Sequence, residues 1–245
     1  MWDRYIAVDG KRAFHIGNIC ETCSFFFERL EAANQSINVD EIVEHLNVGV
    51  STLEQGFVEK IQKIMPAGKY KVLLMRIDPK LVRPADPDDY FAKEQIDLCG
   101  VDSFWGLPHY PKTEYYRLST KLLNHRGALY EFLIPTLPHN WLDQERVTSY
   151  ISRLQSGGAP TAIALSVLDV KQPAVWHGDP AITSHWCLAH YLLDGHHKVF
   201  AATKAGLPLM LLAFLAVEHG ISSREQIEQA AKIVGRSNNR VETGA

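Results

Sequence analysis

The second half of the chain alternates between apolar runs and helix-like segments, and this alternation constrains the fold more than any other feature of the sequence. Apolar runs typical of buried strands occupy residues 129–134, 161–170, 185–194 and 209–217. Helix-like segments, closed by Gly157-Gly158, Gly206 and Gly235, occupy residues 144–155, 197–205 and 222–235. The order strand, helix, strand, strand, helix, strand, helix predicts a mixed α+β fold.

The first half of the chain carries weaker and less regular signals. Residues 4–17 are typical of a β-hairpin with Asp9-Gly10 as its two-residue turn. Helices are expected over residues 18–33, 40–45 and 51–65, with the run from Phe25 to Phe27 in the core of the first, and strands over residues 70–77 and 114–123. The proline-rich stretch 78–112 is expected to be loop, with at most a short helix at residues 90–95. We place a domain boundary after residue 127, between an N-terminal α/β region (1–127) and a second domain (128–245).

Charge and composition argue against several classes of protein. The 245 residues carry a net charge of −3 and are 46% hydrophobic and 22% charged, as in ordinary globular proteins. Nucleic-acid binding draws on clustered Lys and Arg, so duplex DNA is not an expected partner. The longest apolar run, residues 207–217, falls short of the roughly 20 residues of a membrane span. The first residues lack a signal-peptide core and only four cysteines are present, so we expect a cytoplasmic protein.

The sequence Asp194-Gly195-His196-His197-Lys198 joins a buried strand to the start of a helix. The free amides at a helix N-terminus attract anions, and glycine lets the backbone approach a ligand closely. The three side chains that follow Gly195 add positive charge or hydrogen-bond donors at the same point. His190 lies on the same strand face as Asp194 and could line the same site. The loop therefore favours phosphate binding, and a plain strand-to-helix turn with solvated side chains is the alternative.

Residues 129–217, and this loop above all, resemble the ParB/sulfiredoxin superfamily, in which a helix after a Gly-x-x-Arg strand end grips nucleotide phosphates. Asp-Gly-His-His-Lys is most similar to the Asp-Gly-His-His-Arg motif of a free-serine-kinase branch. The resemblance implies a ParB/sulfiredoxin-like C-terminal domain behind an N-terminal α/β extension, and a nucleotide, ATP or ADP with Mg²⁺, as ligand. Gly195, His196, His197 and Lys198 would hold phosphates and Asp194 could hold Mg²⁺, or instead cap the helix.

The branches of this superfamily differ in chemistry, and the matching positions separate them. His196 stands where sulfiredoxins have a cysteine, and His-His-Lys replaces the Glu-Arg-Arg of partition proteins. The kinase branch has a catalytic carboxylate near the position of Asn140, where Asp143 or Glu145 could substitute as general base beside His196. We therefore expect phosphotransfer to an unidentified small-molecule acceptor, or nucleotide hydrolysis. A ParB-like DNA-associated or nuclease-like protein and a non-catalytic nucleotide sensor are the alternatives.

Cys20 and Cys23 form a CxxC pair that could bind zinc. His15 lies five residues earlier and could be a third ligand. A structural zinc site needs four ligands, usually from two such pairs, and the sequence has no second CxxC. Redox chemistry and buried structural thiols remain the alternatives for this pair.

Overall fold

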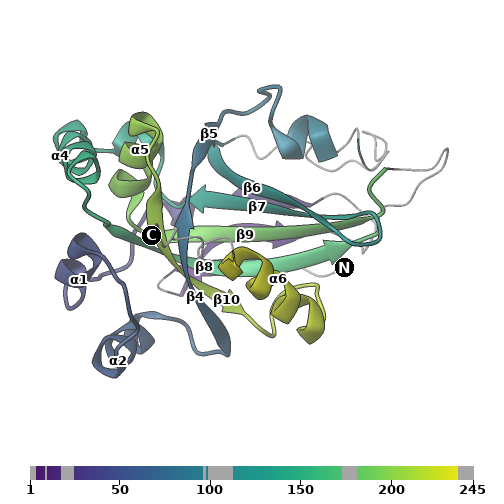
Figure 1. Ribbon diagram of the computed structural model, residues 1–245, viewed down its shortest axis with the longest axis horizontal. Coiled ribbons are helices and arrows are strands. Elements are labelled where there is room, and N and C mark those ends of the chain that lie inside the picture. The colour runs from purple at the N-terminus through teal and green to yellow at the C-terminus, as the bar shows by residue number, and fades with distance from the viewer. Residues whose placement is uncertain are drawn as a thin grey trace, which may run out of the picture.

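The computed structural model describes residues 4–8, 10–17, 25–95, 98, 113–172 and 181–236. The fold is a mixture of helices and strands, as the sequence predicts (Figure 1). Its strands are β1 (Arg4–Val8), β2 (Lys11–Gly17), β3 (Phe26–Arg29), β4 (Tyr70–Ile77), β5 (Lys80–Val82), β6 (Tyr115–Leu123), β7 (Gly127–Pro135), β8 (Thr161–Lys171), β9 (Ser184–Asp194) and β10 (Leu209–Ala216). Its α-helices are α1 (Val43–Val48), α2 (Gln55–Ile64), α4 (Gln144–Gln155), α5 (His196–Ala205) and α6 (Arg224–Arg236). Short helical turns cover Glu31–Ala33, Tyr90–Glu94 and His139–Trp141.

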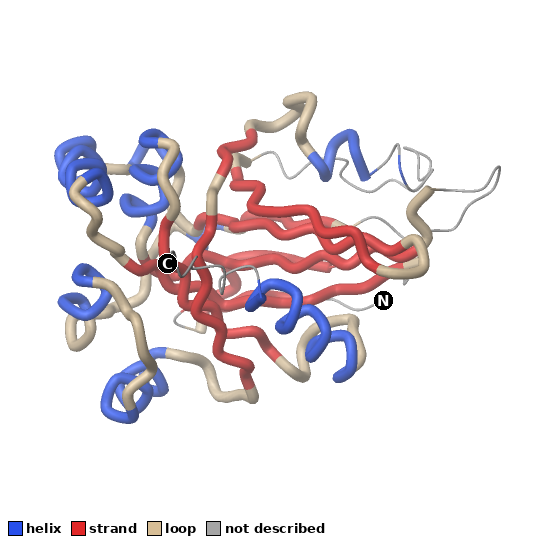
Figure 2. Tube along the Cα trace, viewed as in Figure 1, coloured by secondary structure: helices blue, strands red, loops and turns tan. Residues whose placement is uncertain are grey.

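A seven-stranded sheet with the order β4-β10-β8-β9-β7-β6-β5 forms the centre of the molecule. Its two outer strands, β4 and β5, are consecutive in the chain and separated only by Asp78 and Pro79. Two residues span about 10 Å at most between the strand ends, so the sheet must curl until its edges nearly meet. Figures 1 and 2 show β4 and β5 crossing in front of the other strands, which makes the sheet resemble a partly closed barrel.

The second half of the chain follows the predicted order of elements from β7 to α6. β8 pairs in parallel with β10, β7 pairs in parallel with β9, and the other neighbours are antiparallel. The expected boundary after residue 127 falls at the β6–β7 hairpin, and β4, β5 and β6 from the first half complete the sheet. No helix among the described residues is long and apolar enough to cross a membrane.

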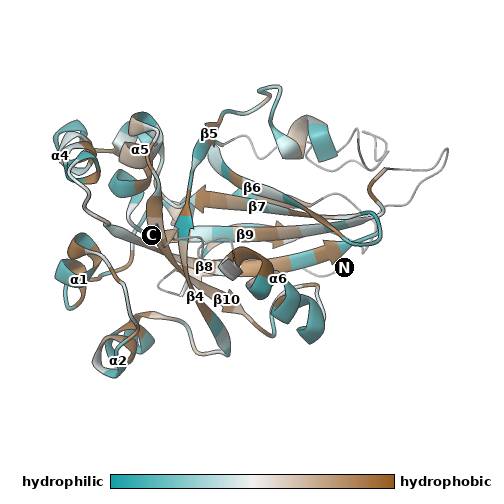
Figure 3. Ribbon diagram, in the orientation of Figure 1, coloured by the Kyte–Doolittle hydropathy of each residue, from teal (hydrophilic) through white to brown (hydrophobic). Residues whose placement is uncertain are grey.

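Apolar cores lie on both faces of the curled sheet. Inside the curl, leucines of β7, β8, β9 and β10 pack against α4, α5 and α6. On the outer face, the β1-β2-β3 sheet packs around Phe14 and Phe27, and α1 and α2 cover β10 through Leu46, Phe57 and Ile61. Figure 3 shows this pattern as brown central strands with teal on the outer sides of the helices. The helices α1, α4 and α5 gather at one end of the sheet (Figure 1).

Residues 25–33 correct the sequence-based expectation of a helix. Phe26–Arg29 form strand β3, which pairs antiparallel with β2, and a 3₁₀ turn follows it. Phe25 and Phe27 are buried while Glu28 is exposed, which is the two-residue alternation of a half-buried strand. The rest of that expected helix, residues 18–24, lies outside the described residues. The three-residue strand β5 was also not expected within the proline-rich stretch.

Candidate anion-binding site

Helix α5 begins at Gly195, directly after strand β9, in a conformation that requires glycine. Gly195 has φ +97°, and a Cβ there would lie 2.7 Å from the Cβ of Ala162. No side chain caps this helix start. The first bond within the helix runs from the Val199 amide to the Gly195 carbonyl, 2.9 Å, so the amides of His196, His197 and Lys198 have no partner inside the helix.

His196 points away from solvent and holds the loop that follows β7. The residue is 4% exposed, and its Nε2 accepts hydrogen bonds from the amides of Thr136 at 3.1 Å and Leu137 at 3.2 Å. Burial, and then the neighbouring His197, His139 and Arg29, lower the pKa of His196 to about 3. The ring is therefore a neutral acceptor at ordinary pH, and its contacts are those of a residue that positions the loop.

His197 joins the N-termini of α4 and α5. Its Nε2 accepts a hydrogen bond from the Asp143 amide at 3.1 Å, and burial followed by the charge of Arg146 lowers its pKa. Asp143 is the N-cap of α4, where its carboxylate accepts from the amides of Glu145 and Arg146. The structure thus brings Asp143 beside the loop with its carboxylate engaged as a cap. Glu145 lies in the first turn of α4 and is exposed.

Lys198 is buried and faces Asp194 across the first turn of α5. Its side chain Nζ lies 3.7 Å from the Asp194 carboxylate and donates to the carbonyls of Thr161 at 2.9 Å and Leu46 at 3.4 Å. Burial lowers the pKa of Lys198, and Asp194 opposes that shift. The lysine therefore ties α5 to β8 and α1 while it brings a cation to the helix start. Asp194 is its ion-pair partner and does not cap α5.

Two arginines of α4, which the sequence reasoning missed, lie beside this lysine. Arg146, Tyr150 and Arg153 are spaced by four and three residues and so share one face of the helix. The Arg153 guanidinium lies 6.0 Å from the centre of the Tyr150 ring, and Lys198 Nζ lies 5.9 Å from it. Both arginines act to lower the pKa of Lys198 by like-charge repulsion. The spacing of these residues was visible in the sequence. However, a polar helix face usually just faces solvent, so the spacing alone did not indicate a site.

His190 is buried within the curled sheet, away from this cluster. Its Nδ1 lies 2.6 Å from the Ser166 hydroxyl and its Nε2 lies 3.2 Å from Glu131, which also accepts from Ser119 at 2.6 Å. Four residues of strand separate His190 from Asp194, about 13 Å along β9. Burial acts to raise the pKa of Glu131, but His190 and then Ser119 lower it overall. His190 therefore belongs to a polar chain across four strands, from β8 to β6.

The proposed zinc ligands are only partly within the described residues. Cys20 and Cys23 lie outside them, while His15 lies on β2, stacked on Tyr5 with ring centres 5.0 Å apart. Within the part of the chain that the structure describes, no group of three or more His, Cys, Asp or Glu side chains is placed to hold a metal ion. Zinc at the CxxC pair stays a prediction.

The cluster at the start of α5 brings three cations together with the carboxylates of Asp194 and Asp143. Lys198, Arg146 and Arg153 are cations, and Asp194 forms the one ion pair among them in the described residues. A hollow of about 520 Å³ lies beside Arg153. Its lining residues are Glu44, Asn47, Val48, Arg153 and Gly158. Comparisons with protein families, with curated proteins and with solved structures found no match to this chain.

Proposed function

We propose that the protein binds a nucleotide, with its phosphates at the start of α5. The carrying observation is an uncapped helix N-terminus with Lys198 in its first turn, together with Arg146 and Arg153, whose charges repel that lysine. A bound anion would relieve that repulsion and satisfy the amides of residues 196–198. The nucleotide class, and the ParB/sulfiredoxin-like fold, come from the resemblance of the Asp194–Lys198 loop and are part of the proposal.

The contacts in the cluster indicate which residues would position the backbone and which would contact a phosphate. Gly195 allows close approach, and His196 and Lys198 fix the surrounding backbone through their buried hydrogen bonds. Arg146 is exposed, and its charge acts on both His197 and Lys198, so it is the cation that we assign to a phosphate. Mg²⁺ is usually held by one or two carboxylates together with substrate phosphates, and Asp194 is the carboxylate at this position.

Phosphotransfer or nucleotide hydrolysis would need a general base near the phosphates. Asp143 is engaged as the α4 cap, so Glu145, which is exposed in the first turn of the same helix, is the freer carboxylate. Incubation with ATP and Mg²⁺ followed by measurement of released phosphate distinguishes a nucleotide hydrolase from a nucleotide sensor. Turnover that a Glu145→Gln variant loses supports the catalytic proposal. Binding without turnover supports the sensor.

Calorimetric titration with ATP tests the binding proposal directly. We expect the Arg146→Gln variant to bind about tenfold more weakly than the native chain, since a hydrogen bond to a charged group contributes about 1.5–3 kcal/mol. Lys232→Gln is the matched control, because Lys232 is an exposed cation on α6 and does not belong to the cluster. Equal affinity of all three proteins, or no binding by the native chain, would contradict the assignment.

A further inference from the structure

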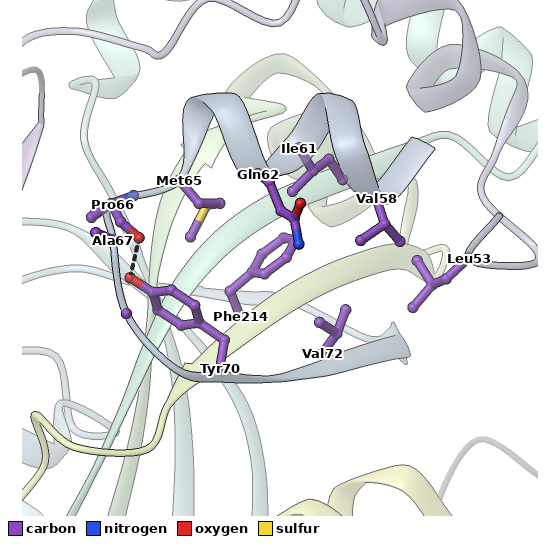
Figure 4. Close-up of a pocket in the computed structure, with 11 residues that line it drawn as sticks. Leu53, Val58, Ile61, Gln62, Met65, Pro66, Ala67, Tyr70, Val72 and Phe214 are labelled. Atoms are coloured by element: carbon purple, nitrogen blue, oxygen red, sulfur yellow. Dashed lines mark hydrogen bonds between the residues drawn. The ribbon is translucent and has the colours of Figure 1, made fainter. Parts of the chain in front are cut away.

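An apolar groove lies between helix α2 and strand β4, on the outer face of the curled sheet. It has a volume of about 430 Å³, and its walls are mostly aliphatic and aromatic (Figure 4). The lining side chains come from the segment before α2, from α2, from the following loop, and from β4 and β10: Leu53, Val58, Ile61, Gln62, Met65, Pro66, Ala67, Tyr70, Val72 and Phe214. The polar side-chain groups are the Gln62 amide and the Tyr70 hydroxyl, which donates to the Pro66 carbonyl at 2.9 Å. No charged residue lines the groove, so it favours an apolar occupant.

The lower wall of this groove, β4, is the outermost strand of the seven-stranded sheet. β4 pairs with β10 on one side, and no described strand pairs with its other side. The amide of Val217 donates to the carbonyl of Lys69 at 2.9 Å, which continues the β4–β10 register by one pair. Because bonded and non-bonded pairs alternate in an antiparallel ladder, Lys71 and Leu73 also bond inward. The backbone groups of Tyr70, Val72 and Leu74 therefore point to the outer edge.

The same β4 residues form both the outer edge of the sheet and one wall of the groove. Tyr70 and Val72 line the groove with their side chains and present their backbone N–H and C=O groups at the outer edge. Val72 is 39% exposed, and so is Leu53 at the end of the groove. Unpaired strand edges template the addition of another strand, and proteins usually cover or charge them. Here an apolar groove adjoins the edge, which adds specificity to backbone pairing.

We propose that this edge and groove dock an extended peptide, which adds a strand to β4 and places a large apolar side chain beneath α2. The backbone groups at the edge recur every second residue, about 6.8 Å apart, and a peptide backbone matches that repeat where a compact apolar molecule does not. The groove accepts side chains from one face of the added strand, so the peptide carries apolar residues at alternate positions. This site is separate from the start of α5 and does not depend on nucleotide binding.

Selection from a library of random eight-residue peptides against the purified full chain tests the proposal. We expect the selected peptides to share alternating apolar residues. Their affinity should fall at least about tenfold for a Val72→Lys variant, which puts a charge at the groove. Leu122→Lys is the matched control, since Leu122 is an 80% exposed apolar residue on β6 that does not line the groove. Selection that enriches nothing over the Val72→Lys protein, or peptides that bind both variants equally, would overturn the proposal.

Backbone pairing has its own readout in amide hydrogen exchange. Addition of a selected peptide should slow exchange at the Tyr70 and Val72 amides by about tenfold or more, while Lys71, already bonded to β10, changes little. Two peptides can be N-methylated, one at the odd and one at the even residues. Only the pattern that removes the amides bonded to β4 should abolish binding. Unchanged exchange at both amides, or protection by an apolar dye alone, would show that the groove takes side chains or small molecules without adding a strand.

Discussion

At the scale of single residues, the start of α5 shows how buried polar groups fix a site. The Nε2 of His196 accepts hydrogen bonds from two amides of the loop after β7, and Lys198 donates to two carbonyls of other elements. Neither side chain is free to turn toward a ligand, yet both determine where the α5 amides point. His197 is held as well, by the Asp143 amide, so the cation that we assign to a phosphate is the exposed Arg146 of α4. The loop thus provides positioning side chains and free amides, and the cation comes from α4.

The neutral state of His196 predicts an acid-sensitive fold. Burial lowers its pKa to about 3, and burial followed by Lys171 lowers the pKa of His185 to about 3. The unfolded chain takes up these protons near pH 6.5, so the stability that both groups contribute is present above pH 6.5 and is lost as pH falls toward 3. Urea titrations at pH 7 and pH 4.5 should show this loss.

A His196→Gln variant should show a shallower loss between the same two pH values, because one of the two groups is removed. A His125→Asn variant is the control, since His125 is exposed in the β6–β7 turn at φ +58°, a conformation that asparagine tolerates. A pH dependence in His196→Gln as steep as that of the native chain would contradict this explanation.

At the scale of elements, the central strands are joined by side chains as well as by backbone bonds. Ser166 on β8, His190 on β9, Glu131 on β7 and Ser119 on β6 form one hydrogen-bonded chain inside the curl. Three of the four are almost fully buried among leucines. Each group in such a chain is satisfied only while its neighbours stay in register, so the chain opposes a slip of one strand past the next.

The effects of removing two neighbouring members of this chain on the free energy of unfolding should not be additive, because each group depends on the other for its hydrogen bond. Glu131→Leu leaves His190 buried without its carboxylate, and we expect a loss of about 3–5 kcal/mol in the free energy of unfolding. A double-mutant cycle with His190→Leu should show a coupling energy above about 1 kcal/mol. Additive effects of the two substitutions in urea denaturation would mean that the hydrogen bond contributes little.

At the scale of the whole molecule, the strands of the second half could be predicted because their apolar runs are long and bounded by glycine or proline. β3 could not, since Phe25–Phe27 fit the core of a helix as well as a strand, and only pairing with β2 decides between them. The curl of the sheet was also beyond prediction, because it depends on β5, a strand of three residues. In the candidate site, the loop was found from its motif. The contact of His196 with Thr136 could not be predicted, because the two residues are 60 positions apart in the sequence.

The expected domain boundary after residue 127 leads to a final prediction about the whole chain. Residues 128–245, produced alone, would expose the face of β7 and β9 that carries Phe132 and Tyr191, since Phe14, Phe27 and Phe91 cover it in the full chain.

The isolated fragment would also lose the β6 partner of β7 and the bidentate Arg4–Asp169 ion pair, with contacts of 2.9 and 2.6 Å. Burial of each large apolar side chain contributes roughly 1.5–3 kcal/mol, and natural domains are stable by only about 5–15 kcal/mol. We therefore expect the fragment to lack a cooperative thermal transition and to bind a hydrophobic dye, in contrast to the full chain. A fragment that unfolds cooperatively near the midpoint of the full chain would establish residues 128–245 as an autonomous domain with its own sufficient core.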